Sequence, residues 1–295
     1  MVAELSSFED YLRVFQKNLL SGKRILITGG ATGLGKSMGQ RFLELGATLY
    51  ICGRREQVLN EAAEELRRAT GGTVKTFVCD VRDSARVEAM VDEIWNDGPL
   101  DVLVNNAAGN FIARTEELSL GAFEAVIGIV LMGTLHVTLA CGRRWLKQGH
   151  HASVLSITTT YAESGSAYVV PSSVAKAGVL NLMRSLAVEW GPRGIRLNAI
   201  APGPIPTEGA FSRLMPVKSL EDLAKKRNPL GRFGTHEELA NLAAFLVSDQ
   251  SGYVNGHQIV MDGGEWLKGA SEFSGLGDIL TEEQWQAMKP KKKSP

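Results

Sequence analysis

Residues 24–42 read RILITGGATGLGKSMGQRF, a short β-rich run that passes through a glycine-rich turn into a helical pattern. Gly29, Gly33 and Gly35 would permit a tight turn, a close approach of the backbone to a phosphate, and tight packing of the helix on the strand. The amide groups at the start of the helix would then face the anion. In this context of strand, turn and helix, the glycine pattern predicts a dinucleotide-binding α/β fold.

The rest of the chain continues the alternation of short apolar runs and longer helical stretches. Further β-rich runs cover 48–52, 73–78, 100–105, 152–157, 195–200 and 257–261. Between them lie stretches of 3.6-residue periodicity, such as VLNEAAEELRRA at 58–69 and ARVEAMVDEIW at 85–95, which are long enough to cross back over a sheet. The alternation predicts a single domain with a doubly wound parallel sheet and helices on both faces.

Length and composition fit one globular domain with extensions. We divide the 295 residues into an N-terminal extension (1–21), a dinucleotide-binding domain (22–264) and a tail (265–295) with a short helical candidate, EEQWQAM, and a basic end, KPKKKSP. The basic end is typical of a solvated tail. Thirty-two basic and 32 acidic residues give no net charge, so no bulk attraction to nucleic acid or to an anionic membrane is expected.

The cysteines and the N-terminal residues indicate a compartment. Cys52, Cys79 and Cys141 lie far apart without CxxC spacing, which favours a reducing environment and predicts neither a metal site nor a disulfide framework. The N-terminal stretch contains acidic residues and no apolar core, unlike a secretory signal or a transit peptide. We also expect no segment that is long and apolar enough to span a bilayer. These features predict a cytoplasmic protein without a membrane partner.

The end of the second predicted strand bears on the choice of nucleotide. An NAD-selective site usually carries an acid there, whereas this chain has Arg54 and Arg55. Two guanidinium groups offer charge-assisted hydrogen bonds to a 2′-phosphate, so the site favours NADP; the alternative is two surface arginines that open a helix. Asp80, after the third strand, is a candidate acceptor for the adenine amino group, or a helix cap nearby.

Ligands on such sheets lie beyond the carboxyl ends of the strands. The candidate loops are therefore NNAAGN (105–110), TTTYAESG (158–165) and APGPIPT (201–207), together with the helix that follows YVVPSS and carries Lys176. None of the five histidines belongs to these loops, so we expect no histidine base.

The glycine loop, NNAAG (105–109), Lys176 and PGPIPT (202–207) resemble the short-chain dehydrogenase/reductase family over 22–264, which implies a Rossmann fold. Most members of that family carry a tyrosine four residues before the lysine, where this chain has Ser172. A serine hydroxyl is too weak an acid to replace a phenol beside a cation. Thr159 and Met132 occupy the positions of the family's usual serine and asparagine. Either the chain is a silent cofactor-binding protein, or its acid comes from elsewhere.

Longer stretches, such as LSITTTYAESGSAYVVPSSVAKAGV (155–179) and RFGTHEELANLAAFL (232–246), resemble the mitochondrial-type 2,4-dienoyl-CoA reductases of this family, which reduce a conjugated thioester with NADPH. The resemblance implies that Tyr161 and Asn110 hydrogen-bond the thioester carbonyl, that Ser172 supports them and that Lys176 holds the nicotinamide ribose. The implied substrate contacts are Phe111 and Arg213. The implied cofactor contacts, besides Lys176, Arg54, Arg55 and Asp80, are Thr28, Gly29, Gly33, Leu34, Gly35, Val81, Asn106, Ala107, Pro202, Gly203, Ile205 and Thr207.

The electron flow of that reaction agrees with the missing tyrosine. Hydride added to the far end of a dienoyl thioester leaves negative charge on the thioester oxygen, so catalysis mainly requires donors aimed at that oxygen. Protonation of the dienolate at its α-carbon by water would give the 3-enoyl thioester. Methionine at 132 is tolerable if that position works through its backbone carbonyl, whereas proton delivery suffers if an amide side chain is needed.

Other interpretations remain open at this point. The enzymatic alternative is a 3-oxoacyl-thioester reductase, and the alternative of another class is a silent NADP(H)-binding sensor or scaffold. Plainer roles for the site residues are a packed aromatic at Tyr161, a turn at Asn110, a helix cap at Ser172 and a surface residue at Arg213. The family resemblance also implies a homo-oligomer, most often a tetramer, with an acyl-CoA as the small-molecule partner.

Overall fold

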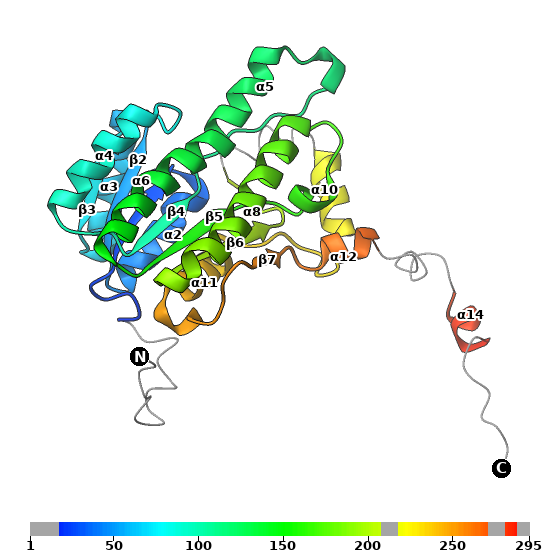
Figure 1. Ribbon diagram of the computed structural model, residues 1–295. Coiled ribbons are helices and arrows are strands. Elements are labelled where there is room, and N and C mark those ends of the chain that lie inside the picture. Colours follow the sequence, from blue (N-terminus) through cyan, green and yellow to red (C-terminus); the bar gives the residue numbers. More distant parts are fainter. Residues whose placement is uncertain (1–17, 208–217, 271–280, 288–295) are drawn as a thin grey trace.

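The computed structural model describes residues 18–207, 218–270 and 281–287, and its centre is one parallel sheet (Figure 1). The seven strands stand in the order β3-β2-β1-β4-β5-β6-β7. They are β1 (Arg24–Thr28), β2 (Thr48–Gly53), β3 (Val74–Val78), β4 (Val102–Asn105), β5 (Ala152–Ile157), β6 (Ile195–Pro202) and β7 (Gln258–Met261). All seven predicted runs are strands, and the predicted doubly wound fold is confirmed.

Helices cover both faces of the sheet (Figure 1). One layer consists of α2 (Gly33–Glu44), α3 (Glu56–Thr70) and α11 (His236–Val247), and the other of α4 (Ser84–Asn96), α6 (Gly133–Gln148) and α8 (Val170–Trp190). Along β1, Ile25 and Ile27 pack toward the first layer and Leu26 toward the second. Because both faces are covered, the strands are apolar on both sides, which explains their continuous hydrophobic runs.

The strand order reverses between β1 and β4. At such a switch point the loops after the two strands diverge and leave a crevice at the carboxyl end of the sheet. Here these loops are the glycine-rich turn after Thr28 and the NNAAGN loop that begins at Asn105. The topology therefore brings the motifs of the first and fourth strands together.

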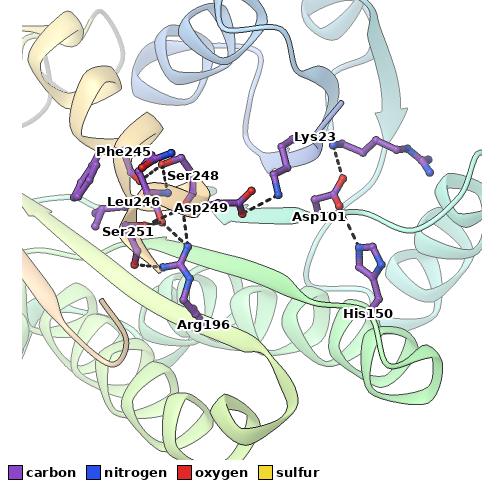
Figure 2. Close-up of polar contacts among 11 residues, drawn as sticks. Lys23, Asp101, His150, Arg196, Phe245, Leu246, Ser248, Asp249 and Ser251 are labelled. Atoms are coloured by element: carbon purple, nitrogen blue, oxygen red, sulfur yellow. Dashed lines mark hydrogen bonds and ion pairs between the residues drawn. The ribbon is translucent and has the colours of Figure 1, made fainter. Parts of the chain in front are cut away.

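A polar cluster lies at the opposite end of the sheet, where the strands begin (Figure 2). The guanidinium of Arg196, near the start of β6, donates to the carbonyls of Ser251 and Val254 at 3.0 Å, of Ser248 at 3.0 Å and of Leu246 at 3.3 Å. These carbonyls lie at and after the end of α11, where a helix leaves its last carbonyls without partners. The arginine thus anchors α11 to the amino end of β6, the end of the sheet that faces away from the crevice.

The expectation that no segment could span a bilayer was wrong on length and composition. A continuous helical stretch, Leu120–Gln148, runs through α5 (Leu120–Ile127), a π-helical turn and α6, and an 18-residue window within it has a mean hydropathy of 2.0. Within the fold, 44% of that window is buried, and the second half of the stretch lies in α6, where Val137, Cys141 and Trp145 pack against the sheet and α4. A charge-free apolar run suits the interior of a protein as well as a bilayer.

Shorter elements complete the described chain. They are α7 (Tyr161–Ser164), α10 (Lys218–Arg227), α12 (Glu265–Ala270) and α14 (Glu282–Ala287), and α14 coincides with the predicted helical candidate. The basic end of the tail lies outside the described residues.

Candidate active site

The glycine-rich turn after β1 is built for close approach of another group. Gly29 and Gly33 have φ of +65° and +51°, a backbone region that favours glycine. A Cβ at Gly35 would lie 2.5 Å from the carbonyl oxygen of Gly29, so no larger residue fits there. A Cβ at Gly33 would meet only the Thr207 side chain, at 3.5 Å, among the described residues. The turn is therefore tight inside and open above the first turn of α2.

The loops after β1 and β4 are hydrogen-bonded to each other. The Thr28 hydroxyl accepts from the backbone amides of Asn106 and Ala107, both at 3.0 Å. The Asn106 side-chain amide donates to the carbonyls of Thr28, at 3.0 Å, and Gly29, at 3.2 Å. Leu34, by contrast, packs partly against the core. These bonds fix the floor of the crevice.

The crevice fits a dinucleotide. The helix cap Thr32 makes no side-chain bond to α2 within the described chain, so its hydroxyl does not occupy the amides of the first turn. Those amides and the helix dipole favour a pyrophosphate, and the glycine backbone leaves room for it. When bound, a reduced nicotinamide dinucleotide would supply the hydride, while Gly29, Gly33 and Gly35 would hold its phosphates.

Basic residues gather where the adenosine end of a dinucleotide would lie, beyond β2 and β3. Arg54 and Arg55 are exposed directly after β2. Asp80 is engaged by Arg82, whose backbone amide and guanidinium both donate to its carboxylate. The bonds from Arg82 lower the pKa of Asp80, and the charge of Arg54 adds to this effect. Asp80 is thus no helix cap, since Asp83 caps α4, and cations outnumber the acid.

Replacing both Arg54 and Arg55 with alanine should reduce the preference for NADPH over NADH by roughly one to two decades, because charge-assisted bonds to the 2′-phosphate are lost. The measurement is the ratio of the two cofactor dissociation constants. Arg68→Ala, on the exposed surface of α3, removes one such positive charge elsewhere and should leave the ratio unchanged. An unaltered ratio in the double variant would refute the nucleotide assignment.

Val81, a further cofactor candidate, has defined surroundings. Val81 is buried against α6, where a Cβ at Gly133 would lie 2.5 Å from its side chain. Its carbonyl lies 3.0 Å from Nδ1 of His136. Val81 therefore fixes the wall between β3 and α6.

The loop 202–207 leaves the end of β6 and passes over α2. Gly203 donates to the Met261 carbonyl at 2.9 Å, and a Cβ there would lie 2.8 Å from Asp262. Ile205 is buried in the core, and Pro202 ends the strand. Thr207 reaches the space above Gly33, which places this loop over the glycine-rich turn as predicted.

Three side chains from three elements meet on the other side of the crevice. Asn110 Nδ2 donates to the Tyr161 hydroxyl oxygen at 3.3 Å, and Ser172 Oγ lies 3.3 Å from the same oxygen. Asn110 Oδ1 accepts from the Phe111 amide at 2.9 Å, which turns the NH₂ group of Asn110 toward the tyrosine. Either hydroxyl can be the donor between Ser172 and Tyr161. When Ser172 donates, the phenol oxygen accepts from both neighbours and the Tyr161 proton is free for an external acceptor.

Lys176 lies one helical turn after Ser172 on α8 and is buried. Its ammonium donates to the Ile157 carbonyl at the end of β5. Burial lowers the pKa of Lys176 to about 8, because the charged form loses its hydration. The remaining N–H groups of the ammonium are available to ribose hydroxyls.

The start of α8 differs from the helix-cap interpretation of Ser172. The helix begins at Val170 after Val169, with Pro171 in its first turn, so Ser172 is already inside the helix. Its hydroxyl is buried at Tyr161 instead of capping amides. Tyr168, the weaker candidate for the tyrosine, has φ of +64° and a side chain that is 58% exposed.

The remaining sequence candidates have different placements. Met132 ends a π-helical turn, Gly128–Met132, whose Leu131 packs on Gly178 of α8. Phe111 is half-buried and packs against the cluster of Val126, Val130, Ala175 and Val179 beside that turn. Arg213 lies outside the described residues. Within 18–207, 218–270 and 281–287, His, Cys, Asp and Glu side chains form no group of three that could hold a metal ion.

Sequence reasoning missed two side chains at the crevice. Arg82 could have been found, since an Asp-x-Arg sequence after a strand allows the pairing with Asp80 that the structure shows. His236 was assigned to no candidate loop, yet its ring contacts the Pro206 carbonyl. No local pattern reveals that contact, because 30 residues separate the two.

Comparison with known proteins identifies the family of this chain. A family model described as Enoyl-(Acyl carrier protein) reductase matches residues 29–265. The Caenorhabditis elegans protein named probable 2,4-dienoyl-CoA reductase 3, (3E)-enoyl-CoA-producing, is 44% identical over 90% of this chain and 87% of its own length. The Bacillus subtilis protein named probable 2,4-dienoyl-CoA reductase, (2E)-enoyl-CoA-producing, is 47% identical over 83% of this chain and 97% of its own.

Solved structures agree on the fold. A short-chain dehydrogenase from Bacillus anthracis is 41% identical with a TM-score of 0.76, covering 82% of this chain and 96% of that one. A gluconate 5-dehydrogenase from Burkholderia cenocepacia, solved in complex with NADP and tartrate, is 31% identical with a TM-score of 0.80, covering 84% of this chain and 97% of that one.

Proposed function

This chain belongs to the short-chain dehydrogenase/reductase family and is an oxidoreductase, and from that premise we propose that it reduces 2,4-dienoyl-CoA to 3-enoyl-CoA with NADPH. The observation that carries the proposal is the Tyr161 hydroxyl, held between Asn110 and Ser172 at 3.3 Å from each. It provides a phenol donor beside the helix that carries Lys176, where the helix itself has only the hydroxyl of Ser172.

The chemistry assigns a role to each side chain. Tyr161 and the second N–H of Asn110 would donate to the thioester oxygen as negative charge develops there, and Ser172 would keep the phenol in place. Lys176 would hold the ribose and add a positive field. The half-buried Phe111 would contact the acyl group. These groups stabilise an enolate oxygen, and none of them has to protonate a carbonyl oxygen outright.

The position of protonation decides the product. The dienolate carries negative charge at its α- and γ-carbons, so α-protonation gives a 3-enoyl thioester and γ-protonation a 2-enoyl thioester. The names of the two relatives above differ on this point, (3E)-enoyl-CoA-producing for one and (2E)-enoyl-CoA-producing for the other. We assign α-protonation by water to this chain, because the donors at the thioester oxygen stabilise the dienolate, whose α-carbon carries more negative charge than its γ-carbon.

A substrate comparison tests the proposal. With NADPH and a 2,4-dienoyl-CoA, the chain should oxidise the cofactor, remove the dienoyl chromophore and give the 3-enoyl product. A 3-oxoacyl thioester should be turned over much more slowly, because Ser172 is too weak an acid to protonate an alkoxide. Faster turnover of the 3-oxoacyl thioester would contradict the proposal. We further propose that the enzyme acts in the cytoplasm as a homo-oligomer, in keeping with its three free, buried cysteines and its family.

A further inference from the structure

His236 bridges two walls of the cofactor crevice. It is the first residue of α11, following the capping-box residue Thr235. Its Nδ1 lies 2.6 Å from Ser37 Oγ on α2, and its Nε2 lies 2.6 Å from the carbonyl oxygen of Pro206. Both ring nitrogens are therefore used, one on the helix that faces the pyrophosphate and the other on the loop that passes over it.

The acceptor at Pro206 fixes the proton arrangement of a neutral ring. A carbonyl oxygen can only accept, so Nε2 carries the N–H and donates to it. Nδ1 then accepts from the Ser37 hydroxyl, whose oxygen lies 3.2 Å from the Gly33 carbonyl in the first turn of α2. Because that hydroxyl carries a single proton, its bond to Nδ1 and its bond to the Gly33 carbonyl are alternatives. With the bond to Nδ1 formed, Ser37 and His236 join α2 to the loop.

The contact between His236 and Pro206 holds the second half of the loop 202–207. The first half of the loop is held by Gly203 on β7, by the Pro204 carbonyl, which accepts from Gly234, and by the buried Ile205. Proline has no N–H, so the carbonyl is the only backbone hydrogen-bonding group that Pro206 offers. The next residue, Thr207, faces Gly33, directly over the pyrophosphate position.

We propose that His236 is a positioning residue that ties the loop 202–207 to α2 and sets the height of this loop over the bound NADP(H). The inference rests on the proposed cofactor and extends it to a side chain to which the resemblance assigns no role. His236 touches neither the phosphates nor the substrate; it acts through Pro206 and Ser37.

The test is NADPH affinity of the full chain, measured by fluorescence titration. His236→Ala should weaken NADPH binding roughly tenfold, the effect of losing one to two hydrogen bonds. Its kcat at saturating NADPH should remain within about twofold of the parent, because the loss falls on binding. His236 lines an open surface cavity of about 330 Å³, so its removal leaves no void in the core.

Conservative variants separate the loop bond from general packing. Glutamine places its amide N–H near the Nε2 position and should restore most of the affinity, whereas asparagine reaches only the Nδ1 position and should not. His257→Ala, an exposed histidine before β7, serves as the matched control and should bind NADPH like the parent.

Three results would overturn the inference. The first is a parent-like NADPH affinity of His236→Ala, and the second is an equal NADPH affinity of the glutamine and asparagine variants. Either would refute the bridge alone, since the parent protein would still bind NADPH. A parent protein that binds no NADPH would refute the proposed function together with the bridge.

Discussion

Replacing Tyr161 with phenylalanine is expected to lower kcat for a 2,4-dienoyl-CoA by roughly two to three decades, since one donor to developing charge is removed. NADPH affinity should stay at the parent value, because the tyrosine faces the thioester and not the nucleotide. Steady-state kinetics with a parallel NADPH titration measures both. Tyr168→Phe is the matched control, since that exposed side chain has no assigned role and its loss should be neutral.

Asn110→Ala should give a loss of similar size, and its combination with Tyr161→Phe tests the bond between them. Asn110 Nδ2 donates to the tyrosine oxygen, so the residues act as a unit and the double variant should lose far less than the product of the two single effects. Independent, multiplicative effects would show that the two side chains do not cooperate. Parent-like turnover in both single variants would refute the site.

Lys176→Met should produce the second large effect, a loss in kcat/KM of roughly two decades or more, as expected when a buried cation near the reaction centre is removed. The same substitution removes a charge that the folded chain buries. Thermal unfolding of the variant at neutral pH should therefore occur at or above the parent temperature, which separates a catalytic defect from misfolding. Lys147→Met, an exposed lysine at the end of α6, is the control.

The pKa of Lys176 gives this prediction a pH signature. Burial lowers the pKa of Lys176 from its ordinary value of 10.5 to about 8. In the free enzyme the ammonium is charged below about pH 8 and neutral above it, so kcat/KM for NADPH should fall as the pH rises through this value. The stability changes in the opposite sense: the folded chain binds this proton less tightly than the unfolded chain, so stability should rise between about pH 8 and 10.5. The methionine variant should lack both limbs.

The fold could be predicted from the sequence because its signals are local. The strand RILIT and the glycine-rich turn can be recognised within about a dozen residues. Burial of both faces of the sheet makes each strand a continuous apolar run. The same logic failed for Leu120–Gln148, since an 18-residue apolar window such as the one within it looks alike in a protein interior and in a bilayer. Burial against neighbouring elements, which decides between them, is not a local property.

The site could be predicted only in part. Topology and motif resemblance together bring Asn110, Tyr161 and Ser172 to one edge, and the structure places their side chains in contact. The pairing of Asp80 with Arg82 is local and readable from the Asp-x-Arg sequence. The contact of His236 with Pro206 depends on tertiary packing and leaves no local pattern in the sequence. The sequence allows Ser172 to be a helix cap, but the helix begins two residues before it. The Ser172 hydroxyl is therefore buried inside the helix and caps no amide.

The central claim is that the pocket stabilises an anion on the thioester oxygen, with the hydroxyl of Tyr161 as its main donor. A crystal structure with NADP⁺ and an unsaturated acyl-CoA tests it most directly, through the distance from Tyr161 Oη to that oxygen. We predict a hydrogen bond of about 2.5–3.0 Å, with Asn110 Nδ2 as the second donor. A thioester oxygen bound elsewhere, with the tyrosine hydroxyl turned away from it, would contradict the account.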